Sequence, residues 1–370
     1  MNRENNFEEI QPIPSATIPL PVAGKDMNSI LKSLETGVEN IFTGDKYAQY
    51  LQTMSKFHRY SFNNTLLIAM QRPDATLVTG YRNWQSMGRQ VKKGEKGITI
   101  LAPAPIKRRR EQEILDQNHK PLLDADGKPR TEEVEVVIPR FKPTTVFDIS
   151  QTDGEPIETL APEELTEAVA DYDLFMEAIT AVSPVPIRFD EIAGEAKGYY
   201  HSGDKEIVIQ KGMSESQTIK TAIHETGHAR LHDKDIMEKQ GIEKDRLTKE
   251  VEAESVAYCV CSAFGVDTSE YSFPYIAGWS SNRDMKELKA SMDIIRKTAG
   301  EMIDELSDNL QERFAEKKQL LESVQKQKLI PAMEAAGYHF DELESTDGNL
   351  RFLPDGTHEI GGVMISDSWN

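Results

Sequence analysis

The sequence predicts an α+β protein made of two domains, and three observations support this prediction. First, the chain has 370 residues, which is more than one hydrophobic core usually serves. Second, runs with helical periodicity alternate with short strand-like runs along the chain. Third, charge is distributed unevenly, since residues 1–150 hold 21 Lys and Arg against 18 Asp and Glu, whereas residues 151–370 hold 22 against 44. The two parts therefore differ in the partners that they can bind.

The first domain is predicted to span residues 27–150, after a disordered stretch at residues 1–26. That stretch contains four prolines and few large apolar residues, so it lacks the side chains that a packed element needs. From residue 27 to about residue 71 the apolar residues recur with a helical period, and Pro73 cannot continue the helix. A short strand, a short helix that ends at Gly88, a basic turn and the strand "ITILAP" are expected next.

A hairpin arm and a closing strand complete the predicted first domain. Residues 107–130 are highly charged and contain the turn signal Asp126-Gly127. We therefore expect a long arm between "ITILAP" and "EEVEVVIPRF". The stretch "TTVFDISQ" closes the domain, and "TDGEPIETLAPEE" has the composition of a linker.

The second domain is predicted to span residues 151–305 and to combine helices with a small sheet. A helix is expected to open near Pro162, "VPIRFDEI" predicts a strand, and "GYYHSGDKEIVIQ" predicts a hairpin. Ser214, with Gln217 three residues later, predicts a helix start through a capping box. A further helix is expected in "LTKEVEAESVAYCVCSAFG", and residues 306–370 are expected to form a helical extension and a small C-terminal segment.

The composition also bears on the compartment. No run of eighteen apolar residues occurs, so no membrane partner is expected, and the N-terminus does not follow the plan of a signal peptide. Cys259 and Cys261 stand two apart on a predicted helix, where their side chains point to different sides and cannot form a disulfide with each other. A reducing cytoplasm is the expected location.

The stretch "IHETGHARLH" carries the pattern of a catalytic metal site. His224 and His228 stand four residues apart on the helix predicted after Ser214, so their imidazoles can reach one ion. Glu225 is offset by about 100° and can act as a general base on a water molecule at that ion. A tetrahedral catalytic site has three protein ligands, so one more is needed. The pattern favours Zn²⁺, although manganese or iron would accept the same ligands.

The third ligand is expected in "EVEAES", because carboxylates occur there in an otherwise apolar helix. Buried carboxylates are costly unless they are paired or bind a metal. We expect Glu252 to be the ligand, with Glu254 as the alternative. His232 continues the histidine stripe, but ligands at i, i+4 and i+8 span about 12 Å, which is too far for one ion. We therefore expect His232 to support the ligands or the end of the helix.

Residues 51–110 are strongly basic, with 12 Lys and Arg against 2 Asp and Glu, and aromatic residues are interleaved with the cations. Cations neutralise phosphates and aromatic rings stack on exposed bases, so the combination favours single-stranded over double-stranded nucleic acid. The alternative for each aromatic residue, and above all for Trp84, is a place in the hydrophobic core. The candidate nucleic-acid contacts are Arg59, Tyr60, Phe62, Asn63, Asn64, Tyr81, Arg82, Arg89, Lys92, Lys93 and Lys96.

Two parts of the chain resemble one known family. "YSFNNTLLIAMQRPDATLVTGYRNWQSMGRQVKKGEKGITILAP" resembles the single-stranded-DNA-binding N-terminal domain of ArdC-type antirestriction proteins, and "FKPTTVFDISQTDGEPI" matches the close of that domain. "IHETGHARLH" and "EVEAESVAYCVCSAFG" are similar to the family's zincin-like metallopeptidase domain. The resemblance covers residues 28–300, whereas the charged insert at 107–130 and the region after 300 depart from the family pattern.

The resemblance implies an N-terminal α/β domain that binds single-stranded DNA and a C-terminal zincin-like metallopeptidase domain with a helical extension. It also implies a protein of a mobile genetic element that protects incoming DNA from restriction, and it supports Glu252 as the third zinc ligand beside the catalytic Glu225. Two alternatives stay open. One is a single-stranded-DNA-binding protein with a structural or inactive metal site, and the other is a regulatory metalloprotease whose protein substrate is a repressor or a restriction component.

Overall fold

A computed structural model shows a mixed helical and stranded protein, which confirms the predicted α+β class. The residues that it describes are 26–114, 117, 120–123, 127–157, 171–268, 271, 273–324, 351–352, 358–360 and 363–365. The stretch predicted to be disordered lies outside the described residues except for Asp26, and so does the helix start predicted near Pro162. None of the described helices is long and apolar enough to cross a membrane.

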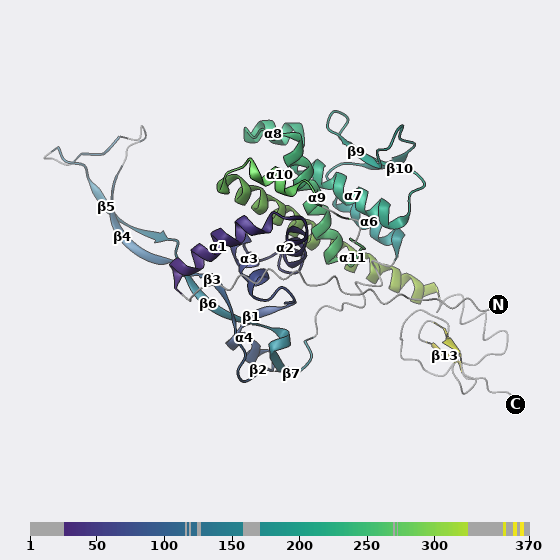
Figure 1. Cartoon of the computed structure of the whole chain (residues 1–370), viewed down its shortest axis with the longest axis horizontal. Coiled ribbons are helices and arrows are strands. Elements are labelled where there is room, and N and C mark those ends of the chain that lie inside the picture. Colours follow the sequence, from purple (N-terminus) through teal and green to yellow (C-terminus); the bar gives the residue numbers. More distant parts are fainter. Residues whose placement is uncertain are drawn as a thin grey trace. The chain divides into compact units, whose positions relative to one another are not determined.

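The chain folds into two compact units (Figure 1). The first unit comprises residues 1–157, 244–263 and 268–299, and the second comprises residues 158–243, 264–267 and 300–370. The sequence therefore returns to the first unit after it has begun the second. A long-range return of this kind cannot be inferred from local periodicity, which predicts elements but not their partners.

Three helices open the first unit where the sequence predicts one long helical region. They are α1 (Met27–Ile41), α2 (Gly44–Lys56) and α3 (Phe62–Gln71). The Asp26 carboxylate accepts the backbone amide of Ser29 at 3.0 Å, and this bond caps the start of α1. The Ser61 hydroxyl accepts the amide of Asn64 at 3.3 Å and caps α3 in the same way.

A three-stranded antiparallel sheet follows, with strand order β1-β6-β3. Its strands are β1 (Val78–Gly80), β3 (Ile98–Pro103) and β6 (Phe141–Asp148). A hydrophobic cluster that includes Phe57, Ile68, Ile98, Ile100 and Val146 forms the core between this sheet and the helices. The short helix α4 (Tyr81–Ser86) follows β1 directly, and β2 (Arg89–Val91) pairs with β7 (Thr152–Gly154) after the 3-10 turn η1 (Ile149–Gln151).

Two side-chain amides of α3, those of Asn64 and Gln71, bind the backbone of β3, which is an edge strand of the sheet. The Asn64 side chain donates to the Leu101 carbonyl at 3.0 Å and accepts the Leu101 amide at 2.8 Å. Two helical turns later, the Gln71 side chain makes the same pair of bonds with Thr99, both at 2.9 Å. An edge strand exposes unpaired backbone groups, and here side-chain amides satisfy them.

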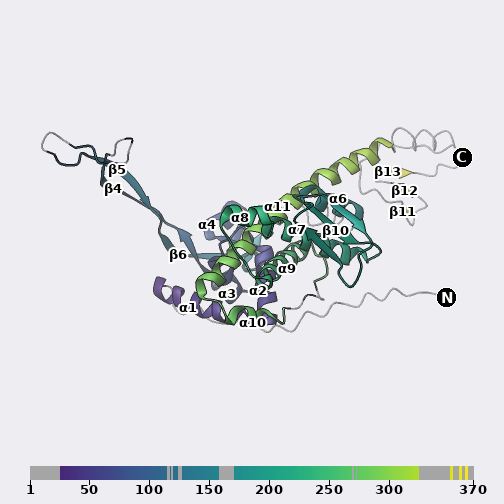
Figure 2. The ribbon, with the colours of Figure 1, turned by 90° about the horizontal axis from the view of Figure 1, so that it is seen from above.

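The predicted hairpin arm is present in the described residues as β4 (Ile106–Glu113) paired with β5 (Thr131–Ile138). It continues the β3–β6 ladder, because the Ala104 amide donates to the Arg140 carbonyl at 2.6 Å. Figures 1 and 2 show that the arm extends well beyond the sheet from which it grows.

The rest of the first unit is helical and comes from the later part of the chain. It consists of α9 (Arg246–Ala263), α10 (Ile276–Ser281) and α11 (Met285–Val324) as far as residue 299. The helices α2 and α9 pack together, and the buried Tyr47 hydroxyl lies 2.8 Å from the Ser255 hydroxyl. This buried pair ties the N-terminal helices to α9 within the same unit.

The second unit contains a small mixed sheet with strand order β8-β10-β9. Strand β8 (Ile187–Asp190) runs parallel to β10 (Glu206–Gln210), and β9 (Gly198–His201) runs antiparallel to it. Helix α7 (Glu215–Leu231) contacts both β9 and β10, and α6 (Tyr172–Val182) contacts α7. Three short strands, β11 (Arg351–Phe352), β12 (His358–Ile360) and β13 (Val363–Ile365), form a separate small sheet.

Asp233 fixes the start of α8 (Lys234–Gln240), directly after α7. Its buried carboxylate accepts hydrogen bonds from Lys205, from Tyr200 and, at 3.2 Å, from Ser202. It also accepts the first amides of α8. The Lys205 ammonium, then the Tyr200 hydroxyl, hold the pKa of Asp233 well below its usual range.

Replacing Asn64 with Ala should destabilise the first unit, because the Leu101 amide and carbonyl would lose their partners. Leaving buried backbone groups unsatisfied costs about 1–3 kcal/mol. We expect a lower unfolding temperature and faster hydrogen exchange of the Leu101 amide. The exposed Gln85→Ala variant is the control, and equal exchange rates in the two variants would contradict the edge-capping role of Asn64.

The stability of the second unit should depend on pH, because the Asp233 carboxylate is protonated in acid. A carboxyl group whose pKa is lowered on folding stabilises the folded state at pH values above about 4, and this contribution is lost as pH falls below that value. Asp233→Asn should therefore lower the unfolding temperature at pH 7 and have a diminishing effect below pH 4. Thermal unfolding at several pH values measures this difference, and Glu238→Gln on the exposed side of α8 is the control.

Candidate metal centre and basic surface

Helix α7 carries the histidine motif and begins at the predicted residue. The Ser214 hydroxyl accepts the backbone amide of Gln217 at 3.3 Å, as a helix cap requires. The Gln217 side chain does not complete a capping box, since its amide donates to Thr221 and its carbonyl oxygen accepts from Lys197. The helix ends at Leu231, and His232 is its C-terminal cap residue.

The imidazoles of α7 form a ladder of close nitrogen contacts. The Nε2 atoms of His224 and His228 lie 3.1 Å apart, and the Nδ1 atoms of His228 and His232 lie 3.0 Å apart. A metal ligand imidazole often donates its second ring N–H to a neighbour, which sets the orientation of the ring. His232 is placed to accept such a bond from His228, so its position agrees with the supporting role predicted for it.

Glu225 is buried on the side of α7 that faces strand β9. Gly198 allows this approach, because a Cβ atom there would lie 2.5 Å from the Thr221 methyl group and 3.4 Å from Glu225 Cγ. Any larger residue at 198 would force the strand away from the helix. The carboxylate of Glu225 is therefore held in a restricted position beside the histidine stripe.

Glu252 lies on α9 with both carboxylate oxygens engaged inside the first unit. Lys244 Nζ lies 2.6 Å from one oxygen, and the Ser291 hydroxyl donates to the other at 2.9 Å. Glu252 is fully buried and the Lys244 side chain is only 12% exposed, so both charges depend on this pairing. The structure thus gives Glu252 a stabilising role that needs no metal.

Glu250 is two residues earlier on α9, which turns it by about 200° from Glu252. In the described part of the chain, His224, His228 and Glu250 are the group with the ligand atoms for a metal ion, and one such atom from each lies within 4.8 Å of the others. Two imidazole nitrogens and a carboxylate oxygen are a donor set for a divalent metal ion. Glu254, the alternative ligand, follows Glu250 by one turn on the same side of α9.

The candidate nucleic-acid contacts separate into an exposed set and a set that belongs to the fold. The exposed set is Arg59, Tyr81, Arg82, Lys92, Lys93 and Lys96. The buried or half-buried set is Tyr60, Phe62, Asn63, Asn64 and Arg89. The sequence pattern did not distinguish the two sets, because a basic or aromatic residue looks the same in either place.

Most residues of the second set have visible structural partners. Phe62 is buried with its ring centroid 5.7 Å from that of Tyr50, and the Tyr60 hydroxyl donates to the Val78 carbonyl at 3.1 Å. The Arg89 guanidinium donates to Thr152 Oγ1 at 2.8 Å, which holds β2 against β7. Trp84 is fully buried, so it has the place in the hydrophobic core that was the alternative to a nucleic-acid contact.

Comparison with known proteins shows two family matches. Residues 21–147 match the N-terminal domain of the anti-restriction factor ArdC, and residues 184–262 match the IrrE N-terminal-like domain of a peptidase family. The second match includes the histidine motif of α7 and the carboxylates of α9. The domain boundaries predicted at residues 26, 150 and 305 stay predictions.

Three curated relatives share sequence with the chain. The uncharacterized protein pXO2-81 of Bacillus anthracis is 28% identical over 74% of this chain and 50% of its own length. Two proteins named DNA primase TraC from Escherichia coli are each 31% identical over 60% of this chain and over 15% and 20% of their own lengths. The chain thus spans about half the length of the first relative and a fifth or less of the primases.

Two solved structures of a plasmid antirestriction ArdC protein are also similar. The metal-free structure has 23% identity and a TM-score of 0.41, with 70% of this chain and 86% of that chain covered. The Mn(II)-bound structure has 21% identity and a TM-score of 0.40, with 68% and 85% covered. The chain thus matches an ArdC N-terminal domain and, after it, an IrrE N-terminal-like domain, and this pairing supports an ArdC-type antirestriction protein.

Proposed function

We propose that this chain is a metal-dependent peptidase coupled to a single-stranded-DNA-binding domain, and that it counteracts restriction of DNA carried by a mobile element. The observation that carries the proposal is the arrangement on α7, where two facing imidazoles stand beside a buried carboxylate. The match to a peptidase family over the same residues supports it. The protein substrate would be a component of the host restriction system or a repressor.

His224, His228 and Glu250 would hold the metal, and the donor set favours Zn²⁺, with manganese or iron as alternatives. When bound, the metal would polarise the scissile carbonyl and lower the pKa of water. Glu225 would take the proton from the attacking water and deliver it to the leaving amine. Its buried position beside the histidine stripe suits this role, since a general base must be held within reach of the water that it deprotonates.

Glu250 replaces Glu252 in this proposal for a physical reason. Both oxygens of Glu252 are bonded to Lys244 and Ser291, so a metal bound by Glu252 would compete with these partners. Withdrawing Glu252 from this pair would leave the Lys244 charge poorly compensated in a low-dielectric interior.

The DNA half of the proposal rests on the exposed cations of the first unit. Arg82, Lys93 and Lys96 are exposed and make no side-chain ion pair with the described residues, so they can neutralise phosphates. The match to the ArdC N-terminal domain and the relatives named as primases support a nucleic-acid partner. Cys259 and Cys261 are both buried and form no disulfide, which suits the cytoplasm, where incoming DNA meets restriction enzymes.

A matched pair of variants tests the metal site. Loss of a residue that only hydrogen-bonds to a metal ligand lowers metal affinity about 10- to 100-fold. Glu250→Gln removes a ligand itself, so it should lower metal affinity by more than this. Glu252→Gln should keep the metal but lower stability by about 3–5 kcal/mol, since Lys244 loses its counter-charge. Metal content and unfolding of the purified full chain measure both effects. A Glu252→Gln protein that folds stably without metal would reverse the assignment.

Glu225→Gln tests catalysis in the same protein. We expect this variant to bind metal like the unaltered chain and to lose protection of a plasmid that enters a restricting host, while His224→Ala loses both. Full protection by a metal-replete Glu225→Gln protein would reject the peptidase and favour a DNA-binding protein with a structural metal.

Single-stranded DNA affinity should fall with salt, because each neutralised phosphate releases counterions. For single strands the slope of log affinity against log salt is about −0.7 per phosphate. Lys93→Ala and Lys96→Ala should each reduce the magnitude of the slope by about this amount, whereas Asn64→Ala should not. Fluorescence anisotropy with oligo-dT at several salt concentrations measures this slope. An affinity that does not change with salt would reject the proposed DNA-binding function.

A further inference from the structure

We propose that the pocket beside Tyr81 binds one unstacked base of the single strand and prefers bases with an exocyclic amino group. The inference rests on the proposed DNA-binding function and adds a base subsite and its selectivity. The pocket lies within the first unit and has a volume of about 620 Å³, enough for a nucleotide. Its walls come from α4, from β2 and the turn after it, from β6 and from β7.

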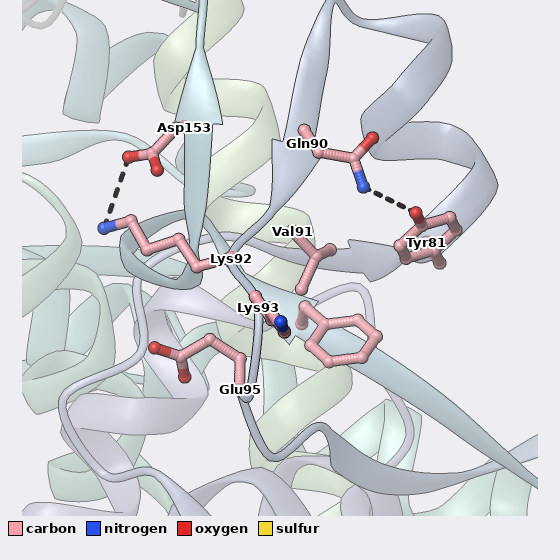
Figure 3. A pocket seen from close by; sticks show the side chains of 8 residues that line it. Tyr81, Gln90, Val91, Lys92, Lys93, Glu95 and Asp153 are labelled. Atoms are coloured by element: carbon pink, nitrogen blue, oxygen red, sulfur yellow. Dashed lines mark hydrogen bonds and ion pairs between the residues drawn. The ribbon is translucent and has the colours of Figure 1, made fainter.

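The aromatic wall is the first argument. Tyr81 is 42% exposed, so part of its ring is accessible to a ligand. Its hydroxyl accepts a hydrogen bond from the Gln90 side-chain amide, which holds the ring in place (Figure 3). The Phe147 ring meets it edge-on, with centroids 6.4 Å apart. The exposed face of a ring held in this way is a platform on which a base can stack.

The polar wall is the second argument. Lys92 lies 3.5 Å from Asp153, and Glu95 accepts a hydrogen bond from Gln151 at 2.8 Å while also lining the pocket. Figure 3 shows the Lys92–Asp153 pair and Tyr81 on opposite sides of the pocket. A pocket for a phosphate alone would repel its ligand with two carboxylates. A base edge, in contrast, presents both donors and acceptors, and carboxylates accept from amino groups.

The remaining lone pairs of the two carboxylates set the preference for bases with an amino group. A carboxylate has about four lone-pair sites, so Glu95 and Asp153 can each accept a further hydrogen bond. Cytosine, adenine and guanine carry an exocyclic amino group that can donate it, and thymine does not. Lys93 is exposed at the same pocket and can meet the phosphate that follows the bound base.

Variants of Tyr81 test the subsite in the full chain. Base stacking on an aromatic side chain contributes about 1–3 kcal/mol, so Tyr81→Ala should weaken binding about 5- to 150-fold without changing the salt slope. Tyr81→Phe should bind nearly as well as the unaltered chain. Tyr199, which is 39% exposed on β9, supplies the matched control Tyr199→Ala, which should have no effect.

Oligo-dC and oligo-dT test the selectivity. The unaltered chain should bind oligo-dC more tightly, and Tyr81→Ala or the double variant Glu95→Gln, Asp153→Asn should remove the difference. A chain that binds oligo-dT with a normal salt slope but is unaffected by Tyr81→Ala would reject the subsite and leave the DNA-binding function standing. Equal affinity for dC and dT with a loss in Tyr81→Ala would reject only the amino-group preference. No DNA binding by the unaltered chain would reject the proposed function itself.

Discussion

The burial of one carboxylate sets the rotation of helix α9, and with it the direction in which the other carboxylates of the helix point. Glu252 is fully buried and is bonded to Lys244 and Ser291. Any turn of α9 about its axis would break these bonds and expose an unpaired charge to the interior, which is among the most costly changes a fold can suffer. Because residues two apart on a helix point about 200° apart, Glu250 must face away from this pair. Glu252 thus anchors the helix, and Glu250 points to a different side of it.

The same geometry organises α7. A step of four residues keeps His224, His228 and His232 on one stripe, whereas a step of one turns Glu225 aside by about 100°. The stripe places a nitrogen of each histidine about 3 Å from the next, and the offset places Glu225 against strand β9. The two candidate histidine ligands and the candidate base come from one helix, so their relation is rigid, and a third ligand would come from elsewhere in the chain.

This difference explains what could be predicted from the sequence and what could not. The motif "HETGH", its helix and the Ser214 cap are local features, and the structure has the helix where the spacing puts it. The choice among the three carboxylates of α9 is not local, since Ser291 lies 39 residues from Glu252. In the same way Asn64 and Arg89 look like DNA contacts in the sequence, but they bind the backbone of Leu101 and the side chain of Thr152. Two side chains of the same type can have different roles, and the role of each depends on the partners that the fold places beside it.

Charge separates the tasks of the two parts of the chain. Residues 151–370 carry twice as many acidic as basic side chains, so this part cannot lie along a phosphate backbone without strong repulsion within about 10 Å. Residues 51–110, with 12 cations against 2 carboxylates, have the opposite balance. Two of the anions near that surface, Glu95 and Asp153, line the same pocket. In the proposed base subsite they would weaken the general attraction for phosphate only locally and would read a base, so a mostly electrostatic surface would gain one point of chemical selectivity.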